Sequence, residues 1–367
     1  MKKVLFLINT LNTGGAERVL VDLAAKLPKD QYEVTVQALC GGSFQNQLPE
    51  HVIYRQMVKI KHPALSGLFM KIFSKLPKLT GRLFIKKGYD LEVAYLEGFP
   101  TKVIAKHKSR GKKLAFVHTN VAQADIISVQ YPNKEACLQQ YKAFDRVCFV
   151  SRQAMEGFYQ VIGELDHGQV IHNVVDVDRV RRRGLEQAPE RYAISGLKLV
   201  CVGRLIDLKG FDRLIRICAQ LEQEFDFEVF ILGDGDQRAA LEEELAKTGC
   251  KSVRLVGMQE NPYAWMQQAD LLVCSSFSEG YSTTIVEALA LGLPVITTAC
   301  AGMKEILEDG KWGMITGLSD EELRAGLRTI LEDRNVYDDL KRRAMTRKEQ
   351  LTAEASIGEY LQLFEQI

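Results

Sequence analysis

Two glutamates that stand eight positions apart, Glu279 and Glu287, are the clearest candidates for chemistry in this sequence. Glu279 lies in a loop after the apolar run 270–274, whereas Glu287 lies within a helical pattern that ends at Gly292. The start of that helix offers hydroxyls and free backbone amides that suit a phosphate, at Ser282, Thr283, Thr284 and Ile285. Carboxylates on either side of a phosphate could hold sugar hydroxyls, and a surface helix with Glu at both ends is the plainer alternative.

An earlier strand, loop and helix carry two cations. The apolar strand 198–202 is followed by Gly203 and Arg204, and Lys209 stands just before a helical pattern at 211–221. Two fixed cations beside a helix N-terminus suit a diphosphate, whereas an isolated Arg or Lys in a loop is usually solvated. The setting between a strand and a helix favours the diphosphate interpretation.

The first strand, 4–8, leads into a glycine pair and a helical pattern, which is how a doubly wound α/β domain begins. Because Gly15 has no side chain, the backbone of this loop can approach a ligand closely. The loop lacks the Gly-x-Gly-x-x-Gly fingerprint, which argues against a nicotinamide enzyme. His118 follows another strand, 113–117, so it should emerge at the carboxyl edge of the sheet, where ligands bind; a structural role is the alternative for a single His.

These segments resemble the motifs of family 4 of the retaining glycosyltransferases, enzymes with the two-domain GT-B fold. The matching stretches are Glu-x7-Glu at 279–287, Gly-Arg and Lys-Gly within 203–210, Gly-Gly-Ala-Glu-Arg at 14–18 and Asn-x-x-Asp at 173–176. The resemblance covers the whole chain and is strongest from 198 to 310. The chain has Ala301-Gly302 where the family often has Gly-Gly, which weakens a donor-loop role for Glu305.

The resemblance implies a role for each candidate residue. The implied catalytic residues are His118, Glu279, Arg204 and Lys209. The implied donor-binding residues are Gly15, Arg204, Lys209, Met258, Ser282, Thr283, Thr284, Ile285 and Glu287. In this scheme Arg204 and Lys209 hold the leaving diphosphate, Glu279 lies near the donor sugar, Met258 lies by the nucleobase and Glu287 binds the ribose.

The alternation of strands and helices predicts α/β domains with largely parallel sheets. The resemblance implies two doubly wound, Rossmann-like domains that face a cleft. We expect an acceptor-binding domain at 1–177, a donor-binding domain at 195–349 and a polar linker at 179–195. The last helix, within 350–367, is expected to cross back and pack on the first domain. A chain of 367 residues suits two domains of ordinary size.

Composition predicts a globular protein of the cytoplasm. Hydrophobic residues make up 46% of the chain and charged residues 26%, and no apolar run is long enough to span a membrane. The apolar stretch at the N-terminus is too short for a signal peptide and predicts a buried strand. The eight cysteines are scattered beside apolar strand residues without a Cys-x-x-Cys pair, as expected for core thiols in a reducing compartment.

The segment 59–88 contains eight Lys or Arg residues and no acidic residue. Its apolar residues recur at helical spacing, among them Leu68, Phe69, Ile72 and Phe73. Its lysines at 71, 75 and 78 share another face. This pattern predicts a peripheral helix that rests on the anionic inner face of the cytoplasmic membrane and inserts those four apolar side chains; a domain helix with solvated lysines is the alternative.

We expect neither a metal nor a nucleic-acid partner. Asp234 and Asp236 form an Asp-x-Asp pair, but Gly-Asp-Gly commonly forms a turn between a strand and a helix. The resemblance to the family also implies a structural turn here. The basic run 181–183 lacks interleaved aromatic residues, which argues against nucleic-acid binding. The implied co-substrate is a UDP- or GDP-linked sugar, with no further cofactor.

The sequence therefore predicts that a hexose is transferred from a nucleotide sugar to a glycan or lipid-linked acceptor, with retention of anomeric configuration, in cell-surface polysaccharide biosynthesis. One alternative is a nucleotide-sugar 2-epimerase of similar fold. Another is a noncatalytic protein that binds nucleotide sugars, which the intact pairs of cations and glutamates disfavour.

Overall fold

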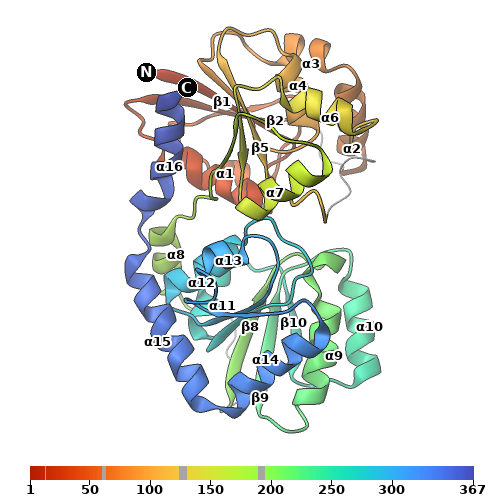
Figure 1. Ribbon diagram of the computed structural model, residues 1–367, viewed down its shortest axis with the longest axis vertical. Coiled ribbons are helices and arrows are strands. Elements are labelled where there is room, and N and C mark those ends of the chain that lie inside the picture. Colours follow the sequence, from red (N-terminus) through yellow and green to blue (C-terminus); the bar gives the residue numbers. More distant parts are fainter. Residues whose placement is uncertain (13, 60–62, 124–129, 189–194) are drawn as a thin grey trace. The chain divides into compact units, whose positions relative to one another are not determined.

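The computed structural model describes residues 1–12, 14–59, 63–123, 130–188 and 195–367, which form two compact α/β units (Figure 1). Unit 1 comprises Met1–Val175 together with Glu354–Ile367, and unit 2 comprises Asp176–Ala353. Each unit has one parallel sheet with helices packed against it, which confirms the predicted pair of Rossmann-like domains.

Unit 1 is built on a seven-stranded sheet in the order β3-β2-β1-β4-β5-β6-β7. The strands are β1 (Lys2–Ile8), β2 (Tyr32–Ala38), β3 (Ile53–Gln56), β4 (Leu91–Ala94), β5 (Lys112–Val117), β6 (Arg146–Phe149) and β7 (Gly168–Val170). Neighbouring strands are parallel, and the central ones read as apolar runs because both faces of the sheet are covered. The chain order reverses between β1 and β4, so the carboxyl ends of these strands are where a ligand is expected.

The helices of unit 1 include the C-terminal one. They are α1 (Gly15–Lys26), α2 (Pro63–Lys75), α3 (Pro77–Phe84), α4 (Phe99–Lys106), α6 (Lys134–Tyr141), α7 (Arg152–Val161) and α16 (Ala353–Gln366), with a 3-10 helix at Ser43–Gln47. On α16 the ring of Tyr360 stacks on Phe116 with 5.7 Å between ring centroids, and Phe364 packs on Phe6. The C-terminal segment therefore completes the core of unit 1, which confirms that the last helix crosses back.

Unit 2 repeats the same topology with six strands in the order β10-β9-β8-β11-β12-β13. The strands are β8 (Leu197–Val202), β9 (Phe227–Leu232), β10 (Val253–Gly257), β11 (Leu271–Cys274), β12 (Val295–Thr298) and β13 (Met314–Thr316). All neighbouring pairs are parallel. The order reverses between β8 and β11, so the loops after these two strands lie side by side at the carboxyl edge.

The helices of unit 2 pack on this sheet through buried apolar faces. They are α8 (Val177–Gly184), α9 (Phe211–Leu221), α10 (Arg238–Thr248), α11 (Pro262–Gln268), α12 (Thr283–Leu291), α13 (Met303–Ile306), α14 (Asp320–Glu332) and α15 (Arg334–Gln350), with a 3-10 helix at Asp207–Lys209.

The expected linker at 179–195 is wrong in its first part, because α8 is a packed helix of unit 2. The Asp176 carboxylate caps its N-terminus by accepting the Arg179 amide at 3.1 Å. Gly184 faces α12, and a Cβ at this position would lie 2.7 Å from the Leu291 side chain. Arg181 donates to backbone carbonyls, including that of Ala290 at 3.2 Å. Arg181 therefore packs against the domain, whereas Arg182 is exposed; residues 189–194 lie outside the described part of the chain.

The helix expected within 59–88 is two helices, α2 and α3, and its apolar residues divide between the core and the surface. The rings of Phe69 and Phe73 lie 5.7 Å apart, and Phe73 also packs on Phe84 at 5.2 Å. Phe73 therefore packs against the core of unit 1 and does not belong to a free apolar face, whereas Phe69 is half-buried beside it. Leu68 and Ile72 are exposed. Residues 60–62 lie outside the described part of the chain. Among the described residues, no helix combines the length and apolar character needed to cross a bilayer.

Candidate functional site

A small pocket opens at the carboxyl edge of the unit 2 sheet, where the loops after β8 and β11 meet. The residues that line it are Val202, Lys209, Phe211, Leu272, Val273, Cys274, Ser275, Ser276, Glu279, Ser282 and Thr284. The pocket thus brings together a cation, a carboxylate and the start of α12, all within one unit.

Lys209 and Glu279 form the charged centre of this pocket. The Lys209 ammonium donates to Glu279 Oε1 at 2.5 Å, and the Ser276 hydroxyl donates to the same oxygen at 2.7 Å. Burial alone would lower the pKa of Lys209, but the negative charge of Glu279 and the hydrogen bond to it outweigh burial. The pKa of Lys209 is therefore raised, and the ammonium is charged at neutral pH.

A close backbone approach fixes the loop that carries Lys209. Gly210 has φ +61°, and a Cβ there would lie 2.4 Å from the Ser275 carbonyl oxygen. Only glycine fits such a contact in this conformation. The Ser275 hydroxyl donates to the Lys209 carbonyl at 2.8 Å. These contacts bind the loop after β8 to the loop after β11, and the two charged side chains meet as a result.

Arg204 lies beside the pocket without lining it. Its side chain is exposed, and within the described residues it makes no ion pair. Its charge acts on Lys209, whose pKa it lowers slightly against the larger effect of Glu279. The carbonyl oxygen of the adjacent Gly203 packs closely against Gly233, where a Cβ would lie only 1.9 Å from it. Arg204 is therefore an available cation on a rigid turn.

The start of α12 forms another wall of the pocket. Ser282 is the N-cap residue, and its hydroxyl makes no capping hydrogen bond. Ser282 and Thr284 line the pocket, whereas Thr283 does not and Ile285 is fully buried. The first amides of the helix have no intrahelical partner, so this end attracts an anion.

Glu287 and Met258 lie outside the lining of the pocket. Glu287, one turn further along α12, is buried and accepts a hydrogen bond from the Tyr263 hydroxyl at 2.9 Å. Met258 follows β10 directly and is 50% exposed. Its predecessor Gly257 adopts φ +84°, which turns the chain at the end of the strand. The structure therefore places these two residues near the carboxyl edge but not in contact with the Lys209 pair.

The Asp-x-Asp turn after β9 has no metal-ligand cluster around it in the described residues. Asp234 and Asp236 are exposed, and Asp234 Oδ1 accepts the neighbouring Gly235 amide at 2.8 Å. In the turn after β12, Gly302 adopts φ +78°, and a Cβ there would lie 2.8 Å from the Gly280 carbonyl oxygen. The Ala-Gly turn that departs from the family motif therefore supports the loop of Glu279, and Glu305 lies beyond it in α13.

In unit 1, His118 lies at the carboxyl end of β5. Burial lowers the pKa of His118, against the opposing effects of the Glu97 charge and a hydrogen bond to the Tyr95 backbone. The imidazole is therefore neutral at pH 7. Its Nε2 is buried and has no hydrogen-bond partner among the described residues. At the start of α1, Gly15 is exposed, and among the described residues outside its own helix and chain neighbours no atom would lie within 4 Å of a Cβ there, so the backbone is open to a ligand.

The sequence reasoning missed two residues that support these candidates. Glu97 is buried, and its Oε1 accepts the His118 amide at 2.7 Å and the Thr119 amide at 2.9 Å. It fixes the backbone at His118. Ser276 instead fixes a side chain, because its hydroxyl donates to Glu279 Oε1. The available signal was position alone, since each follows an inner strand of its sheet within a few residues.

Comparisons with protein families match both units. Residues 13–179 match the family model described as Glycosyltransferase Family 4, and residues 196–333 match the model described as Glycosyl transferases group 1.

Curated relatives align over nearly the whole chain. A Campylobacter jejuni protein named N-acetylgalactosamine-N,N'-diacetylbacillosaminyl-diphospho-undecaprenol 4-alpha-N-acetylgalactosaminyltransferase is 27% identical over 361 residues, 95% of each chain. A second C. jejuni protein, an alpha-1,4-N-acetyl-D-galactosaminyltransferase named for a diNAcBac-PP-undecaprenol substrate, is 26% identical over 100% of this chain and 99% of its own.

Solved structures share the fold. Anabaena HepE has a TM-score of 0.78 at 20% identity, with all of both chains covered. The sucrose-phosphate synthase of Thermosynechococcus elongatus has a TM-score of 0.75 at 18% identity, covering 100% of this chain and 99% of its own. At such identities the likeness establishes the GT-B architecture.

Proposed function

The chain belongs to the family 4 type of glycosyltransferases with the GT-B fold. From this premise we propose that it transfers a hexose from a nucleotide sugar to a lipid-linked or glycan acceptor. We propose further that the transfer retains the anomeric configuration and serves polysaccharide biosynthesis. Unit 2 binds the donor and unit 1 the acceptor. The observation that carries the proposal is the pocket in which Lys209, Glu279 and the start of α12 meet.

This arrangement suits the departure of a nucleoside diphosphate. During transfer the bond from the anomeric carbon to the phosphate oxygen breaks, a bond to the acceptor oxygen forms, and the hydroxyl proton leaves with the diphosphate or to solvent. Lys209, Arg204 and the first amides of α12 stabilise the charge that develops on the diphosphate. Glu279, which Ser276 and Lys209 hold in place, binds the donor sugar. These groups supply the positive charge without a metal.

The printed names of similar proteins support the choice of substrates. HepE was solved with UDP, with UDP-glucose, and with UDP and glucose. Two C. jejuni relatives are named as transferases that act on sugars linked to diphospho-undecaprenol. A UDP-linked hexose or N-acetylhexosamine as donor, and a diphosphate-linked polyprenyl glycan as acceptor, are therefore the first substrates to test.

The test is to incubate the purified protein with a panel of UDP- and GDP-linked sugars, with and without a bacterial lipid extract, and to measure release of nucleoside diphosphate. Release that requires the lipid, with an α-linked product by NMR from an α-linked donor, supports the proposal. A 2-epimerase would act on the donor without an acceptor, and a noncatalytic protein would bind the donor without releasing diphosphate. Either result would replace the proposed reaction.

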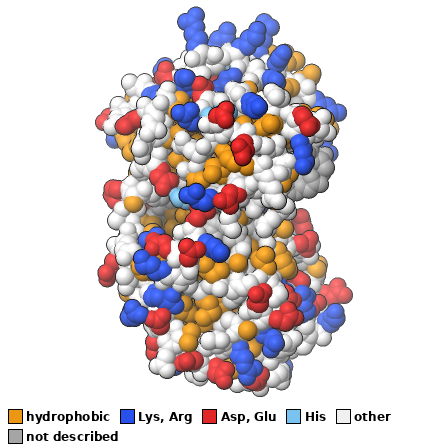
Figure 2. Space-filling model, in the orientation of Figure 1, with side chains coloured by type: hydrophobic (Ala, Val, Ile, Leu, Met, Phe, Trp, Pro, Cys, Tyr) orange, Lys and Arg blue, Asp and Glu red, His pale blue; other side chains and the backbone are white. Residues whose placement is uncertain are grey.

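We also place unit 1 on an anionic membrane surface through α2 and α3. Figure 2 shows Lys and Arg side chains gathered at the top of unit 1, the end where α3 lies in Figure 1. Between them the helices expose leucines and an isoleucine that no core covers: Leu68, Ile72, Leu76, Leu79 and Leu83, at 43–67% exposure. The cations attract the surface to anionic lipid and the exposed apolar side chains insert shallowly. This location brings unit 1 to a lipid-linked acceptor.

Vesicle binding tests this placement. Sedimentation with phosphatidylglycerol vesicles should weaken with added salt and be lost when Lys71, Lys75 and Lys78 are all changed to Glu. The matched control changes three exposed lysines of unit 2, Lys247, Lys251 and Lys311, to Glu and should leave binding intact. If both triple variants lost vesicle binding equally, binding would depend on the net charge of the protein and not on α2 and α3. If the wild type did not bind vesicles at low salt, the proposed membrane-binding surface would be refuted.

A further inference from the structure

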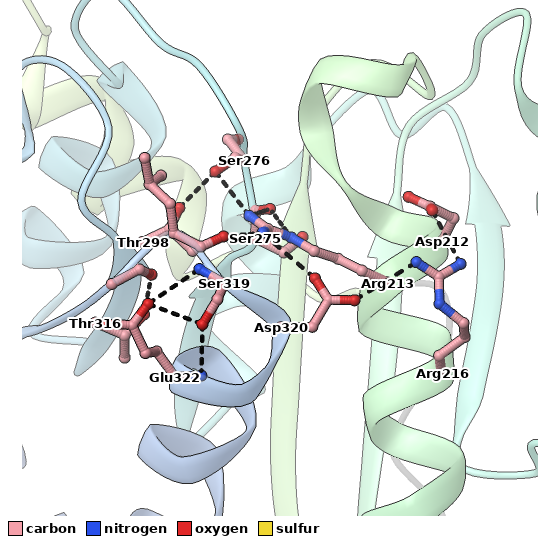
Figure 3. Close-up of polar contacts among 12 residues, drawn as sticks. Asp212, Arg213, Arg216, Ser275, Ser276, Thr298, Thr316, Ser319, Asp320 and Glu322 are labelled. Carbon is pink, nitrogen blue, oxygen red and sulfur yellow. Dashed lines mark hydrogen bonds and ion pairs between the residues drawn. The ribbon is translucent and has the colours of Figure 1, made fainter.

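Arg213 is a buried cation that none of the motifs contains. It lies in the first turn of α9 and is fully buried. Figure 3 shows its guanidinium between the loop after β11 and the loop before α14. Its Nε donates to the Ser275 carbonyl at 2.9 Å, its Nη2 to the Ser276 carbonyl at 2.9 Å and its Nη1 to the Leu318 carbonyl at 2.6 Å. One rigid fork therefore holds the backbone of two loops.

The environment of Arg213 is specific for a guanidinium. Its Cζ atom lies 3.8 Å from the centroid of the Phe277 ring, and Asp320 Oδ1 lies 3.7 Å from Nη1. Burying a cation costs free energy unless hydrogen bonds and a counter-charge offset the loss of water. A planar group with five donors can meet three carbonyls and stack on a ring at once, whereas a lysine cannot.

The held backbone carries the charged pair of the pocket. The Ser276 carbonyl accepts not only from Arg213 but also from Thr298 Oγ1 at 2.5 Å and Cys300 Sγ at 2.9 Å. The Ser276 hydroxyl then donates to Glu279. The Ser275 hydroxyl donates to the Lys209 carbonyl. Ser275 and Ser276, whose backbone Arg213 holds, thus contact both members of the charged pair: Ser276 contacts the Glu279 side chain and Ser275 contacts the Lys209 backbone.

We propose that Arg213 is a positioning residue for the donor site: it fixes the backbone at Ser275 and Ser276, and through their hydroxyls it sets where Glu279 and Lys209 meet the donor's sugar and diphosphate. Arg213 itself is too deeply buried to contact substrate. This inference rests on the proposed function, because it assigns the pocket to the donor. A side chain that only filled space in the core would be replaceable by an apolar residue of similar length.

The chain supplies a matched control one turn further along the same helix. Arg216 also reaches Asp320, at 3.7 Å, and pairs with Asp212 at 3.0 Å and Glu244 at 3.6 Å. Its side chain is 41% exposed. Figure 3 shows Arg216 and Asp212 on the side of Asp320 away from the Ser275 loop. The two arginines share a helix and a carboxylate, but only Arg213 holds the loop.

The experiment compares the full-length variants Arg213→Met, Arg213→Lys and Arg216→Met with the wild type. Steady-state kinetics for the donor and calorimetric binding of UDP are measured well below each thermal midpoint and normalised to folded protein. We expect Arg213→Met to raise the donor KM and the UDP dissociation constant by about tenfold or more, because small displacements of positioning groups have large effects. Arg213→Lys should lie between, and Arg216→Met within about twofold of wild type.

Each outcome decides the inference. If Arg213→Met lowers only the thermal midpoint and leaves the donor KM and UDP affinity of the folded protein unchanged, the role is structural and the inference is wrong. If Arg213→Met does not fold, Arg213→Lys decides, and a folded Lys variant with wild-type donor KM overturns it. Lys209→Ala, assayed in parallel, separates the two proposals: wild-type behaviour of that variant would overturn the donor site itself, whereas an effect there without one at Arg213 would overturn only the positioning role.

Discussion

The carboxyl edges of the two sheets are alike in topology and unlike in chemistry. In unit 2 the edge holds a charged pair, Lys209 and Glu279, whose partners are already in place. In unit 1 the edge holds a neutral imidazole, His118, whose Nε2 is buried without a partner in the described residues. A diphosphate gains most from charges fixed before it arrives, whereas a sugar hydroxyl can be met by a neutral acceptor. The difference fits a donor edge and an acceptor edge.

The unit 1 edge has a further unsatisfied group. Asn9 directly follows β1, and its Oδ1 is also buried with no partner among the described residues. An unsatisfied buried polar atom costs about 1–3 kcal/mol. A bound hydroxyl that donates to one of these atoms would recover part of that cost. The edge of the unit 1 sheet is thus arranged to gain from a neutral hydroxyl group, and the edge of the unit 2 sheet from an anionic group.

Removing the cation of the charged edge should have the largest effect. Lys209→Ala deletes the counter-charge of Glu279 and a donor to the diphosphate, and hydrogen bonds of this charged kind contribute about 1.5–3 kcal/mol. We expect kcat/KM for the donor to fall by about a hundredfold, measured by nucleoside diphosphate release. Lys251→Ala, an exposed lysine of the same unit, is the control and should be unchanged. A near-normal rate for Lys209→Ala would contradict the proposal that fixed charge at the edge of the unit 2 sheet stabilises the diphosphate.

Arg204 should contribute less, because its side chain is exposed and partly screened. We expect Arg204→Ala to lower kcat/KM by about tenfold. Arg204→Lys should restore only part of the rate, since the planar fork that suits a phosphate is lost. Raising the salt concentration should reduce the difference between Arg204→Ala and wild type. An Arg204→Lys variant with full activity would show that only the charge matters.

The sequence predicted the two parallel sheets because buried strands and glycine loops leave a local pattern. It also indicated Lys209 and Glu279, which lie in recognisable loops, although their contact spans 70 positions. It missed Arg213, since the hydrogen bond from this residue to Ser275 joins positions 62 apart and no local rule foresees it. Nothing about an Arg in an amphipathic helix distinguishes a buried fork from a solvated charge like that of Arg216.

Two main errors came from segments whose helical or charge pattern did not show what packs against them. The basic run at 181–183 looked like a solvated linker, but Arg181 donates to the carbonyls of Ala290 and Leu351 in a packed helix. The apolar stripe of α2 looked uniform, but Phe73 turns toward the core whereas Ile72 is exposed. Helical spacing predicts which residues share one face of a helix, but it does not predict whether the core or solvent covers that face.

His118 offers a test of the neutral edge. His118→Gln removes one neutral hydrogen bond, so we expect kcat/KM at pH 7.5 to fall by about threefold to tenfold. Burial holds the pKa of His118 below its ordinary 6.5, so the neutral form predominates at neutral pH and is lost as the pH falls through that lowered pKa. The gap between wild type and variant should therefore narrow in acid. A gap that widens in acid would mean that the charged imidazole is the active form.

The smallest effect is expected from metal removal, and it tests the charged edge most directly. A leaving diphosphate can be stabilised by a metal ion or by fixed protein charges. Here Lys209 is held charged beside the pocket, Arg204 stands near it, and the first turn of α12 adds its free amides. We therefore expect activity in excess EDTA to stay within about twofold of the untreated enzyme. Lys209→Ala should be no more sensitive to EDTA than wild type.

If EDTA abolishes transfer and Mg²⁺ or Mn²⁺ restores it, Asp234 and Asp236 become the first residues to change to Asn, because their exposed carboxylates follow β9 at the same edge of the sheet.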